Sequence, residues 1–312
     1  MRSNTASKRN KQVFLFGPTA SGKTKLVEDF FSDGYQIINA DSVQVYRHLD
    51  IGSAKPSKEL LEKITHYNVD ILDPWEQFTV GDFITRSDEA VRKIESEGDI
   101  PLITGGTAFY FRHFLYGLSE APTADKTVRS QVQLLLQEKG NAALHEMLMK
   151  ADPVSGGRIN VNDTYRITRA LEVYLQTGKP LSSFALPTEP RNGMKPLIIG
   201  LDRDRDELYR RIDLRVDIMF REGLVDEIKS LMKMGASSSW PGMGAIGYRE
   251  FLEAMESGEH SLSLISDRIK TASRRYAKRQ ITFFSSFSDV HWIHPDDTSA
   301  LKKLLDDYLL SE

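Results

Sequence analysis

Residues 17–24 read Gly17-Pro18-Thr19-Ala20-Ser21-Gly22-Lys23-Thr24, and they fit the phosphate-loop pattern G-x-x-x-x-G-K-S/T at every fixed position. An apolar run at Val13–Phe16 precedes this stretch and a plausible helix at residues 25–31 follows it, so the context is strand, loop and helix. Glycines in such a loop let backbone N–H groups and a helix N-terminus converge on one anion. Lys23 adds a positive charge, and the Thr24 hydroxyl can bind Mg²⁺. The motif therefore predicts a ligand that carries phosphates, without deciding which phosphate ester it is.

The composition is typical of a folded globular protein with more than one domain. The chain has 312 residues, of which 40% are hydrophobic and 27% charged, and we expect two domains. Because it contains no cysteine, disulfides and thiolate metal sites are excluded, which favours a reducing compartment and makes the cytoplasm our expectation. No apolar run approaches the ~18 residues of a membrane span, so we expect no membrane partner. Residues 1–11 are polar and basic and are predicted to form a disordered tail.

Strand-like and helix-like segments alternate through most of the chain. This alternation predicts an α/β fold, in which a parallel sheet is flanked by helices. The expected strands, besides the one before the phosphate loop, are at residues 35–40, 66–72, 100–104, 195–201 and 290–293, and the main helices between and after them are at residues 57–64, 79–97, 109–116 and 298–310.

Two turns are expected to reach the same crevice as the phosphate loop, because ligands bind beyond the carboxyl ends of parallel strands. Asp41 follows the strand at residues 35–40, which makes it a candidate base or metal ligand, although an aspartate here can equally cap the next turn. The sequence Gly105-Gly106-Thr107 follows the strand at residues 100–104 and is either a close approach to ligand or a plain tight turn. His66 is expected to be a structural histidine.

The pattern changes between residues 117 and 193. No strand alternates in this range, and residues 126–138, 142–149 and 163–176 read as helices separated by Pro and Gly. The strand at residues 195–201 then resumes the earlier pattern. We therefore expect a helical insertion domain at residues 117–193 inside a catalytic domain made of residues 12–116 and 194–312.

The last third of the chain holds three candidate sites for an anion. Arg211 and Arg215 are four residues apart on a predicted helix, where they either meet one anion or form ion pairs with Asp213 and Asp217. Residues 242–249 form a glycine-dense stretch before a helix, which either presents its amides to a ligand or is an ordinary loop. The net charge of −3 gives no global sign of a polyanion partner, so any such surface must be local. The best local patch is a helix with six cations, which favours contact with phosphates: Arg268, Lys270, Arg274, Arg275, Lys278 and Arg279.

Eight blocks of the sequence, in order and spacing, resemble the tRNA dimethylallyltransferase family from about Val13 to Phe287. They are GPTASGKT, the Asp41-Ser42 pair, IGSAKP, GGT, NDTYRITRALEV, GLVDEI, GAIGYRE and AKRQITF. The resemblance implies a P-loop NTPase-like parallel sheet with a helical insertion. It also implies transfer of the dimethylallyl group of dimethylallyl diphosphate to the exocyclic N6 amine of the adenosine 3′-adjacent to the anticodon, in tRNAs that read codons beginning with U.

The resemblance also implies roles for individual residues. The phosphate loop would hold the leaving diphosphate with Lys23 and with Mg²⁺ on Thr24, Asp41 would be the general base, and Arg215 would stabilise the diphosphate charge. The expected partners are dimethylallyl diphosphate and the anticodon stem-loop of tRNA, and we expect a monomer. The residues implied to contact tRNA are Asp41, Ser42, Val43, Gln44, Thr107, Arg129, Tyr165, Arg166, Ile167, Thr168, Arg169, Gly244, Ala245, Ile246, Gly247, Tyr248 and Arg249.

Two positions depart from the family pattern, and three rival functions stay open. Phe283 stands where the family commonly has Trp, and Gly244 stands where it often has Gln, which puts local contacts there in doubt. A small-molecule or nucleotide kinase would use the same loop to bind ATP. An isopentenyltransferase acting on free adenine nucleotides and a nucleotide-switched RNA-binding protein are the other two rivals. The helical insertion and the basic helix favour tRNA as the acceptor.

Overall fold

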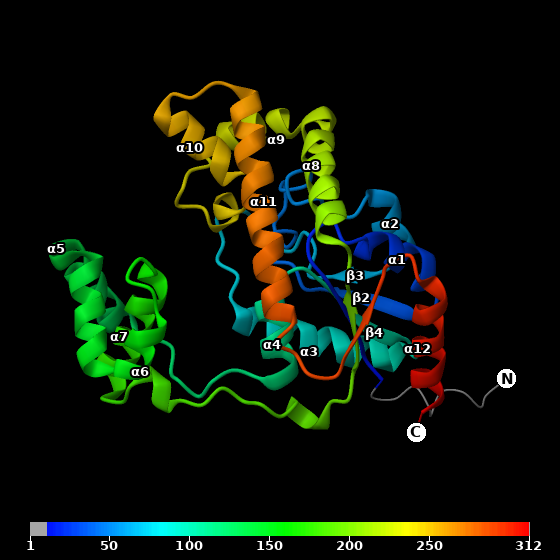
Figure 1. The fold of residues 1–312 in the computed structure, drawn as a ribbon, viewed down its shortest axis with the longest axis horizontal. Coiled ribbons are helices and arrows are strands. Elements are labelled where there is room, and N and C mark those ends of the chain that lie inside the picture. The colour runs from blue at the N-terminus through cyan, green and yellow to red at the C-terminus, as the bar shows by residue number, and fades with distance from the viewer. Residues whose placement is uncertain (1–10, 312) are drawn as a thin grey trace. The chain divides into compact units, whose positions relative to one another are not determined.

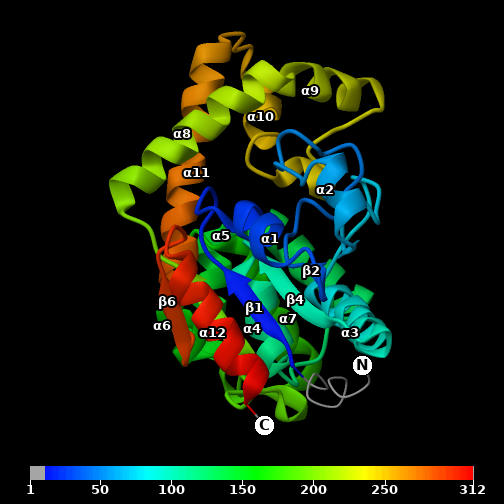
Figure 2. The same cartoon turned by 90° about the vertical axis from the view of Figure 1, so that its right-hand side faces the viewer.

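A parallel sheet forms the centre of the larger part of the protein, which we describe from a computed structural model over residues 11–311. Within this range six strands pair in the order β3-β2-β4-β1-β5-β6, and every pairing is parallel (Figures 1 and 2). Phe14 of the central strand is in register with Ile103 on one side and Ile198 on the other. The strands are β1 (Val13–Phe16), β2 (Tyr35–Asn39), β3 (His66–Tyr67), β4 (Ile100–Gly105), β5 (Leu197–Leu201) and β6 (Val290–Ile293).

Both faces of the sheet are covered, which explains why β1 is an uninterrupted apolar run with no exposed surface. On one face, Val13 and Leu15 belong to a core shared with α1 (Lys23–Phe30), α2 (Lys58–Lys63) and α12 (Thr298–Leu310). On the other face lie α3 (Val80–Glu97) and α4 (Ala108–Tyr116), and Phe14 packs against Phe111 and Phe114 of α4. The α/β class predicted from the alternating pattern is confirmed.

The segment between β5 and β6 is helical. It contains α8 (Arg205–Glu222), α9 (Leu224–Lys233), the short 3-10 helix η3 (Pro241–Gly244), α10 (Arg249–Ser257) and α11 (Leu262–Phe284). Helices α8 and α11 pack side by side beyond the carboxyl ends of the strands, as both views show (Figures 1 and 2). The fold therefore brings the arginine-rich α8 and the basic α11 together above the phosphate loop.

The contacts within the chain divide it into two compact units. Within the described residues, the larger one combines residues 11–115 with residues 192–311, and the smaller one runs from Tyr116 to Arg191. The smaller unit, the helical unit below, contains α5 (Lys126–Ala151), α6 (Pro153–Arg158), α7 (Thr164–Thr177) and η1 (Leu181–Ser183), and η2 (Arg191–Gly193) follows at its end. Val132, Leu144 and Ile167 lie in its own hydrophobic core. This separate core explains why the segment carries a helical pattern without strands.

Several expected elements differ from the structure for local reasons. The strand expected at residues 66–72 ends at Tyr67, because Asn68 and Asp70 adopt positive φ angles of 64° and 54° that no β-strand can hold. The helices expected at residues 126–138 and 142–149 form the single element α5, with a non-helical Gly140 at the junction, and α6 was not expected.

The tail expected at residues 1–11 falls almost entirely outside the described residues. Its last member is an exception, since Lys11 is buried and its ammonium donates hydrogen bonds to the carbonyl oxygens of Tyr308 and Ser311. The expected tail therefore does not include Lys11. Over residues 11–311 the structure contains no helix that is both long and apolar enough to span a membrane.

Candidate active site

The main cavity of the larger unit lies beyond the carboxyl ends of β1, β2 and β4 and has a volume of about 690 Å³. Its walls come from the phosphate loop, the segment after β2, the loop before α10, and helices α8 and α11. Lys23, Asp41 and Arg215 all line it. Segments nearly 200 residues apart in the sequence therefore meet in one place, as the position of ligands in parallel sheets leads one to expect.

Lys23 is folded back onto the loop that carries it. Its ammonium donates hydrogen bonds of 2.9 Å to the carbonyl oxygens of Gly17 and Pro18. Burial, and then the positive charge of Arg215, lower the pKa of Lys23 to about 7. Gly22 adopts φ 109° just before α1, a left-handed conformation that favours glycine. The loop is thus built around a lysine whose charge an incoming anion would restore.

Helix α8 supplies two arginines to the phosphate loop. The Arg215 guanidinium donates to the Thr19 hydroxyl over 3.2 Å, and that of Arg211 donates to the Ala20 carbonyl over 2.9 Å. Arg215 is half-buried, and the loss of hydration lowers its pKa. Ion pairing with the acids of the same helix was one reading of these arginines, and the structure shows that it is wrong.

The acids of α8 face the basic helix α11 instead. Asp213 pairs with Arg274 and Asp217 pairs with Lys270. Two of the six cations predicted to contact phosphates are therefore neutralised inside the protein, which corrects the expectation for Lys270 and Arg274. The other four positions, Arg268, Arg275, Lys278 and Arg279, are exposed.

Asp41 fits both predictions for its position, a residue that caps the next turn and a residue that lines the site. Its Oδ1 accepts hydrogen bonds from the backbone N–H of Val43 at 2.9 Å and of Gln44 at 3.3 Å, so it caps the turn after β2 while it lines the cavity. Thr107 stabilises the same turn, because its hydroxyl accepts a hydrogen bond from the Ser42 N–H over 3.0 Å. His66 also lines the cavity, and burial lowers its pKa while its Nδ1 bonds the Ile64 carbonyl, in agreement with a structural role.

Gln280 is a contact that the sequence did not reveal. Its side-chain oxygen accepts a hydrogen bond from the Thr19 N–H over 2.9 Å, and its amide donates to the Gly106 carbonyl over 2.6 Å. A Cβ on Gly106 would lie 2.7 Å from that amide, and one on Gly105 would lie 2.3 Å from the Ala40 carbonyl oxygen. Glycine is thus required at both positions because neighbouring protein atoms leave no room for a side chain. The sequence of α11 drew attention to its six cations and not to Gln280.

Tyr276, one turn before Gln280, is a second residue that the sequence did not single out. It lines the cavity, and its hydroxyl is 3.4 Å from the Gly106 carbonyl. Burial, and then the negative charge of Asp41, raise its pKa to about 12. It therefore stays a neutral hydroxyl near Asp41.

Some of the residues of the helical unit that are implied to contact tRNA are exposed, and others are buried. Tyr165 is 78% exposed and the side chain of Arg166 is 71% exposed. Ile167 has no exposed surface because it lies in the core of the helical unit, and Thr168 is buried, with its hydroxyl donating to the Tyr165 carbonyl. Their side chains are thus not available for contact, which corrects that part of the expectation. Arg169 and Arg129 lie beside Glu172, each with a nitrogen 3.9 Å from its carboxylate.

The segment 244–249 also contains both accessible and buried residues. Gly244, Ala245, Ile246 and Gly247 line the cavity. Tyr248 has no exposed surface, so the implied tRNA contact of its side chain is also corrected. The side chain of Arg249 is partly exposed and pairs with Glu250 and Glu253.

The cavity fits a metal that arrives with its ligand. The part of the chain described here holds no group of three or more His, Asp or Glu side chains that could bind a metal ion by itself. Thr24 and Asp41 do line the cavity, and two buried polar atoms beside them have no hydrogen-bond partner, Asn39 Nδ2 and Thr104 Oγ1. Asn39 and Thr104 face each other across β2 and β4. The Asn39 nitrogen can only donate a hydrogen bond, but the sparse oxygen donors of Thr24, Asp41 and Thr104 suit Mg²⁺, which keeps waters and shares substrate phosphates.

Comparison with known proteins gives a consistent family. A family model described as IPP transferase matches residues 44–287, and one described as isopentenyl transferase matches residues 11–72. The chain is 42% identical over 295 residues to a tRNA dimethylallyltransferase of Geobacter sulfurreducens, covering 93% of this chain and 94% of that one. It is 41% identical over 290 residues to that of Borreliella burgdorferi, with the same coverage of 93% and 94%.

Solved structures agree with the sequence matches. A full-length tRNA isopentenylpyrophosphate transferase from Bacillus halodurans aligns with a TM-score of 0.67 at 34% identity, covering 96% of this chain and 97% of that one. A eukaryotic dimethylallyltransferase acting on tRNA aligns with a TM-score of 0.75 at 25% identity, covering 95% and 77%.

Proposed function

The chain belongs to the IPP transferase family, and from this premise we propose that its cavity binds dimethylallyl diphosphate beside a tRNA adenosine and transfers the prenyl group to it. The protein is a tRNA-prenylating enzyme. The proposed acceptor is the N6 amine of the adenosine 3′-adjacent to the anticodon, in tRNAs that read codons beginning with U. The observation that supports this best is the presence of Lys23, Arg215 and Asp41 around one cavity, because they provide both anion binding and a base.

The proposed reaction couples one bond formed to one bond broken. The adenosine N6 attacks the allylic carbon, the bond from that carbon to the diphosphate oxygen breaks, and N6 loses a proton. We assign that proton to Asp41, whose Oδ1 is held by the turn after β2. Because an adenine amine is a weak nucleophile, its placement next to the allylic carbon contributes much of the rate.

Lys23 and Arg215 are proposed to stabilise the departing diphosphate. Both are half-buried, and desolvation lowers the pKa of each, so each gains from an anion that replaces the lost hydration; for Lys23 the anion also favours the charged form. Charges held in a cavity away from bulk water act more strongly than exposed ones. Thr24 would hold Mg²⁺ together with diphosphate oxygens, and the metal would neutralise further charge on the leaving group.

The tRNA side of the proposal rests on exposed residues of both units, each considered by itself. In the helical unit Tyr165 offers an aromatic face and Arg166 a cation to the RNA. In the larger unit Arg275 and Lys278 offer cations from α11. The target base must leave its stack to enter a cavity, which costs little in a loop whose bases are already unpaired. A cytoplasmic monomer that meets tRNA directly completes the proposal.

The test is a transfer assay with purified protein and labelled dimethylallyl diphosphate. Unmodified tRNA, free AMP and ATP are offered as acceptors in parallel reactions. Label is expected in tRNA only, and the Asp41→Ala variant is expected to lower the single-turnover rate on the order of 10²-fold or more while tRNA binding stays intact. Label in AMP would point to a transferase for free nucleotides, and phosphoryl transfer from ATP without prenylation would point to a kinase; either result contradicts the proposal.

A further inference from the structure

The carboxylate of Glu227 lies apart from the proposed reacting groups and joins two loops of the cavity wall. Glu227 lies in the first turn of α9, and its Oε2 accepts hydrogen bonds from the N–H of Asp50 at 3.0 Å and of Ile51 at 2.7 Å. Its Oε1 accepts from the Gly52 N–H at 3.1 Å and from the Tyr248 hydroxyl at 2.7 Å. Three consecutive backbone N–H groups make an anion-binding nest, which the protein fills with its own side chain.

The two loops touch at this carboxylate. A Cβ on Gly52 would lie 2.6 Å from the ring of Tyr248, so only glycine allows the approach. The neighbouring Gly247 adopts φ 99°, and a Cβ there would lie 3.5 Å from the Gly52 carbonyl oxygen. Both Gly52 and Gly247 line the cavity. The contact around Glu227 therefore fixes the shape of the cavity wall on two sides.

A chain of hydrogen bonds leads from this contact to the proposed base. The Gln44 side-chain amide donates to the carbonyl oxygens of Ser53 at 3.2 Å and Ala54 at 3.1 Å, both in the loop whose N–H groups bind Glu227. The backbone N–H of the same Gln44 donates to Asp41 Oδ1. A shift of the loop would therefore move the turn that holds the Asp41 carboxylate.

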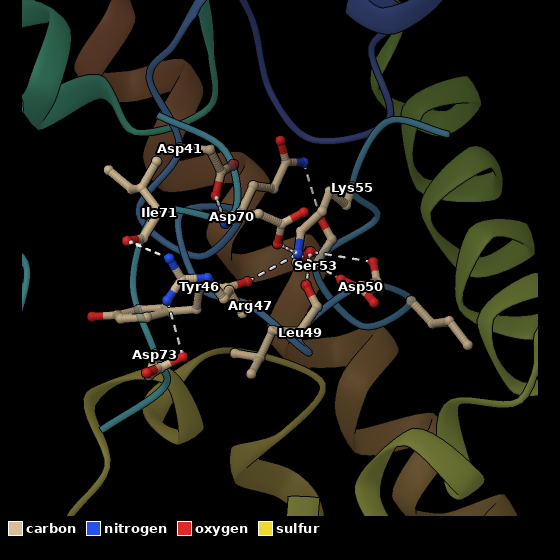
Figure 3. Close-up of polar contacts among 12 residues, drawn as sticks. Asp41, Tyr46, Arg47, Leu49, Asp50, Ser53, Lys55, Asp70, Ile71 and Asp73 are labelled. Atoms are coloured by element: carbon tan, nitrogen blue, oxygen red, sulfur yellow. Dashed lines mark hydrogen bonds and ion pairs between the residues drawn. The ribbon is translucent and has the colours of Figure 1, made fainter. Parts of the chain in front are cut away.

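The far end of the loop is held by a buried lysine. The Lys55 ammonium donates to the Tyr46 carbonyl over 2.9 Å and to the carboxylates of Asp50 and Asp70 (Figure 3). Its side chain is only 5% exposed, and these three acceptors match its three N–H groups. Lys55 thus serves the loop rather than a ligand, and Glu227 is what ties the loop to α9 and to Tyr248.

We propose that Glu227 is a positioning residue for prenyl transfer: its carboxylate holds the loop that anchors Gln44, and Gln44 in turn fixes the turn that presents Asp41. This inference rests on the proposed role of Asp41 as the base. Each of the four hydrogen bonds of Glu227 goes to residues 50–52 or to Tyr248, outside the phosphate loop. Loss of the carboxylate is therefore expected to slow the transfer step and to leave donor binding unchanged.

The test compares Glu227→Gln with a matched control in the same helical turn. The amide keeps the size of the side chain but replaces one accepting oxygen by a group that cannot accept. Single-turnover prenyl transfer at saturating tRNA is expected to fall on the order of tenfold to 100-fold, as for other small displacements of catalytic groups, while the Kd for dimethylallyl diphosphate stays within about twofold. The control Asp226→Asn removes the same charge from an exposed carboxylate that pairs with Lys229, and its rate is expected to match the unmodified protein.

A double-mutant cycle with Gln44→Ala separates positioning from a general loss of structure. If Glu227 acts through Gln44, the double variant is expected to be no slower than Gln44→Ala alone, because the link is already broken. Losses that multiply, or a normal rate for Glu227→Gln, would overturn the inference. Should Glu227→Gln melt below the assay temperature, Tyr248→Phe removes one donor to the same carboxylate and takes its place in the cycle, with the same expected non-additivity.

Asp41→Ala measured in parallel keeps the two proposals apart. A normal rate for Asp41→Ala would contradict the role of Asp41 as base. A slow Asp41→Ala beside a normal Glu227→Gln would leave that role standing and would overturn the role of Glu227 alone.

Discussion

In the cavity the proposed anion-binding cations are half-buried, whereas in the helical unit the cations that are proposed to contact RNA face water. Lys23 has a pKa of about 7 because of its burial and of Arg215 beside it, and burial also lowers the pKa of Arg215. The Arg166 side chain, in contrast, is 71% exposed and lies 3.4 Å from the Asp163 carboxylate. Its charge is surrounded by water, and salt screens it.

The contrast matches two kinds of phosphate ligand. A half-buried cation has already lost part of its hydration, so a small diphosphate that enters the cavity meets strong and fixed charges. An exposed cation binds weakly by itself, but a helical nucleic acid presents many phosphates, and each contact releases counterions. The cavity is thus suited to chemistry on one small group, and the helical unit to the placement of a large polyanion.

The largest effect is expected from removing a half-buried cation of the cavity. Arg215→Gln should lower the single-turnover rate of prenyl transfer on the order of 10² or more, since one lost donor to a developing oxyanion typically costs about 2.7–4 kcal/mol. Binding of tRNA should stay unchanged. The control Arg221→Gln alters an exposed arginine at the end of the same helix, whose Nε donates to the Asp217 carbonyl, and should keep the normal rate. A loss below about threefold for Arg215→Gln would break the contrast.

A change of pH is expected to have a smaller effect, which acts on the affinity of the cavity for dimethylallyl diphosphate. Above about pH 7 the unliganded Lys23 is increasingly neutral, and a bound diphosphate must restore its proton. The affinity for dimethylallyl diphosphate should therefore fall as pH rises from 7 to 9, by up to about tenfold per unit, with proton uptake on binding. Calorimetry in two buffers of different ionisation enthalpy measures that uptake.

Two variants sharpen this pH prediction. Lys23→Met should bind more weakly and lose the pH dependence. In Arg215→Gln the fall should begin at a higher pH, because the Arg215 charge is the second cause of the lowered Lys23 pKa. An affinity that is flat from pH 7 to 9, without proton uptake, would show that Lys23 is charged before the ligand arrives.

The smallest effect is expected from one exposed cation. Arg166→Gln should weaken tRNA binding only about two- to threefold at moderate salt, and should reduce the slope of log K against log salt by about 1. The rate at saturating tRNA should stay normal. Lys302→Gln removes the same charge from an exposed position on α12 and serves as the control. An unchanged slope for Arg166→Gln would remove this residue from the proposed RNA surface.

Much of the fold could be predicted because its signals are local. The strand Val290–Ile293 and the helix Thr298–Leu310 have the predicted bounds, since strand and helix periodicities are carried by neighbouring residues. The β3 strand is shorter than predicted, because Asn68 adopts a positive φ that its apolar neighbours did not reveal. The phosphate loop likewise predicts a site for phosphates from its pattern alone, because all of its fixed positions lie within eight consecutive residues.

The sequence by itself determined the position of the phosphate loop at Gly17 to Thr24 and, by resemblance, the reaction expected there. Only the tertiary structure decided which neighbours the charged residues meet. A helical sequence sets the angle between Arg215 and Asp217, but not which element packs against each face. The phosphate loop covers one face and α11 the other, so the arginine meets Thr19 and the aspartate meets Lys270. Glu227 illustrates the same limit, because its partners at residues 50–52 are some 175 positions away along the chain.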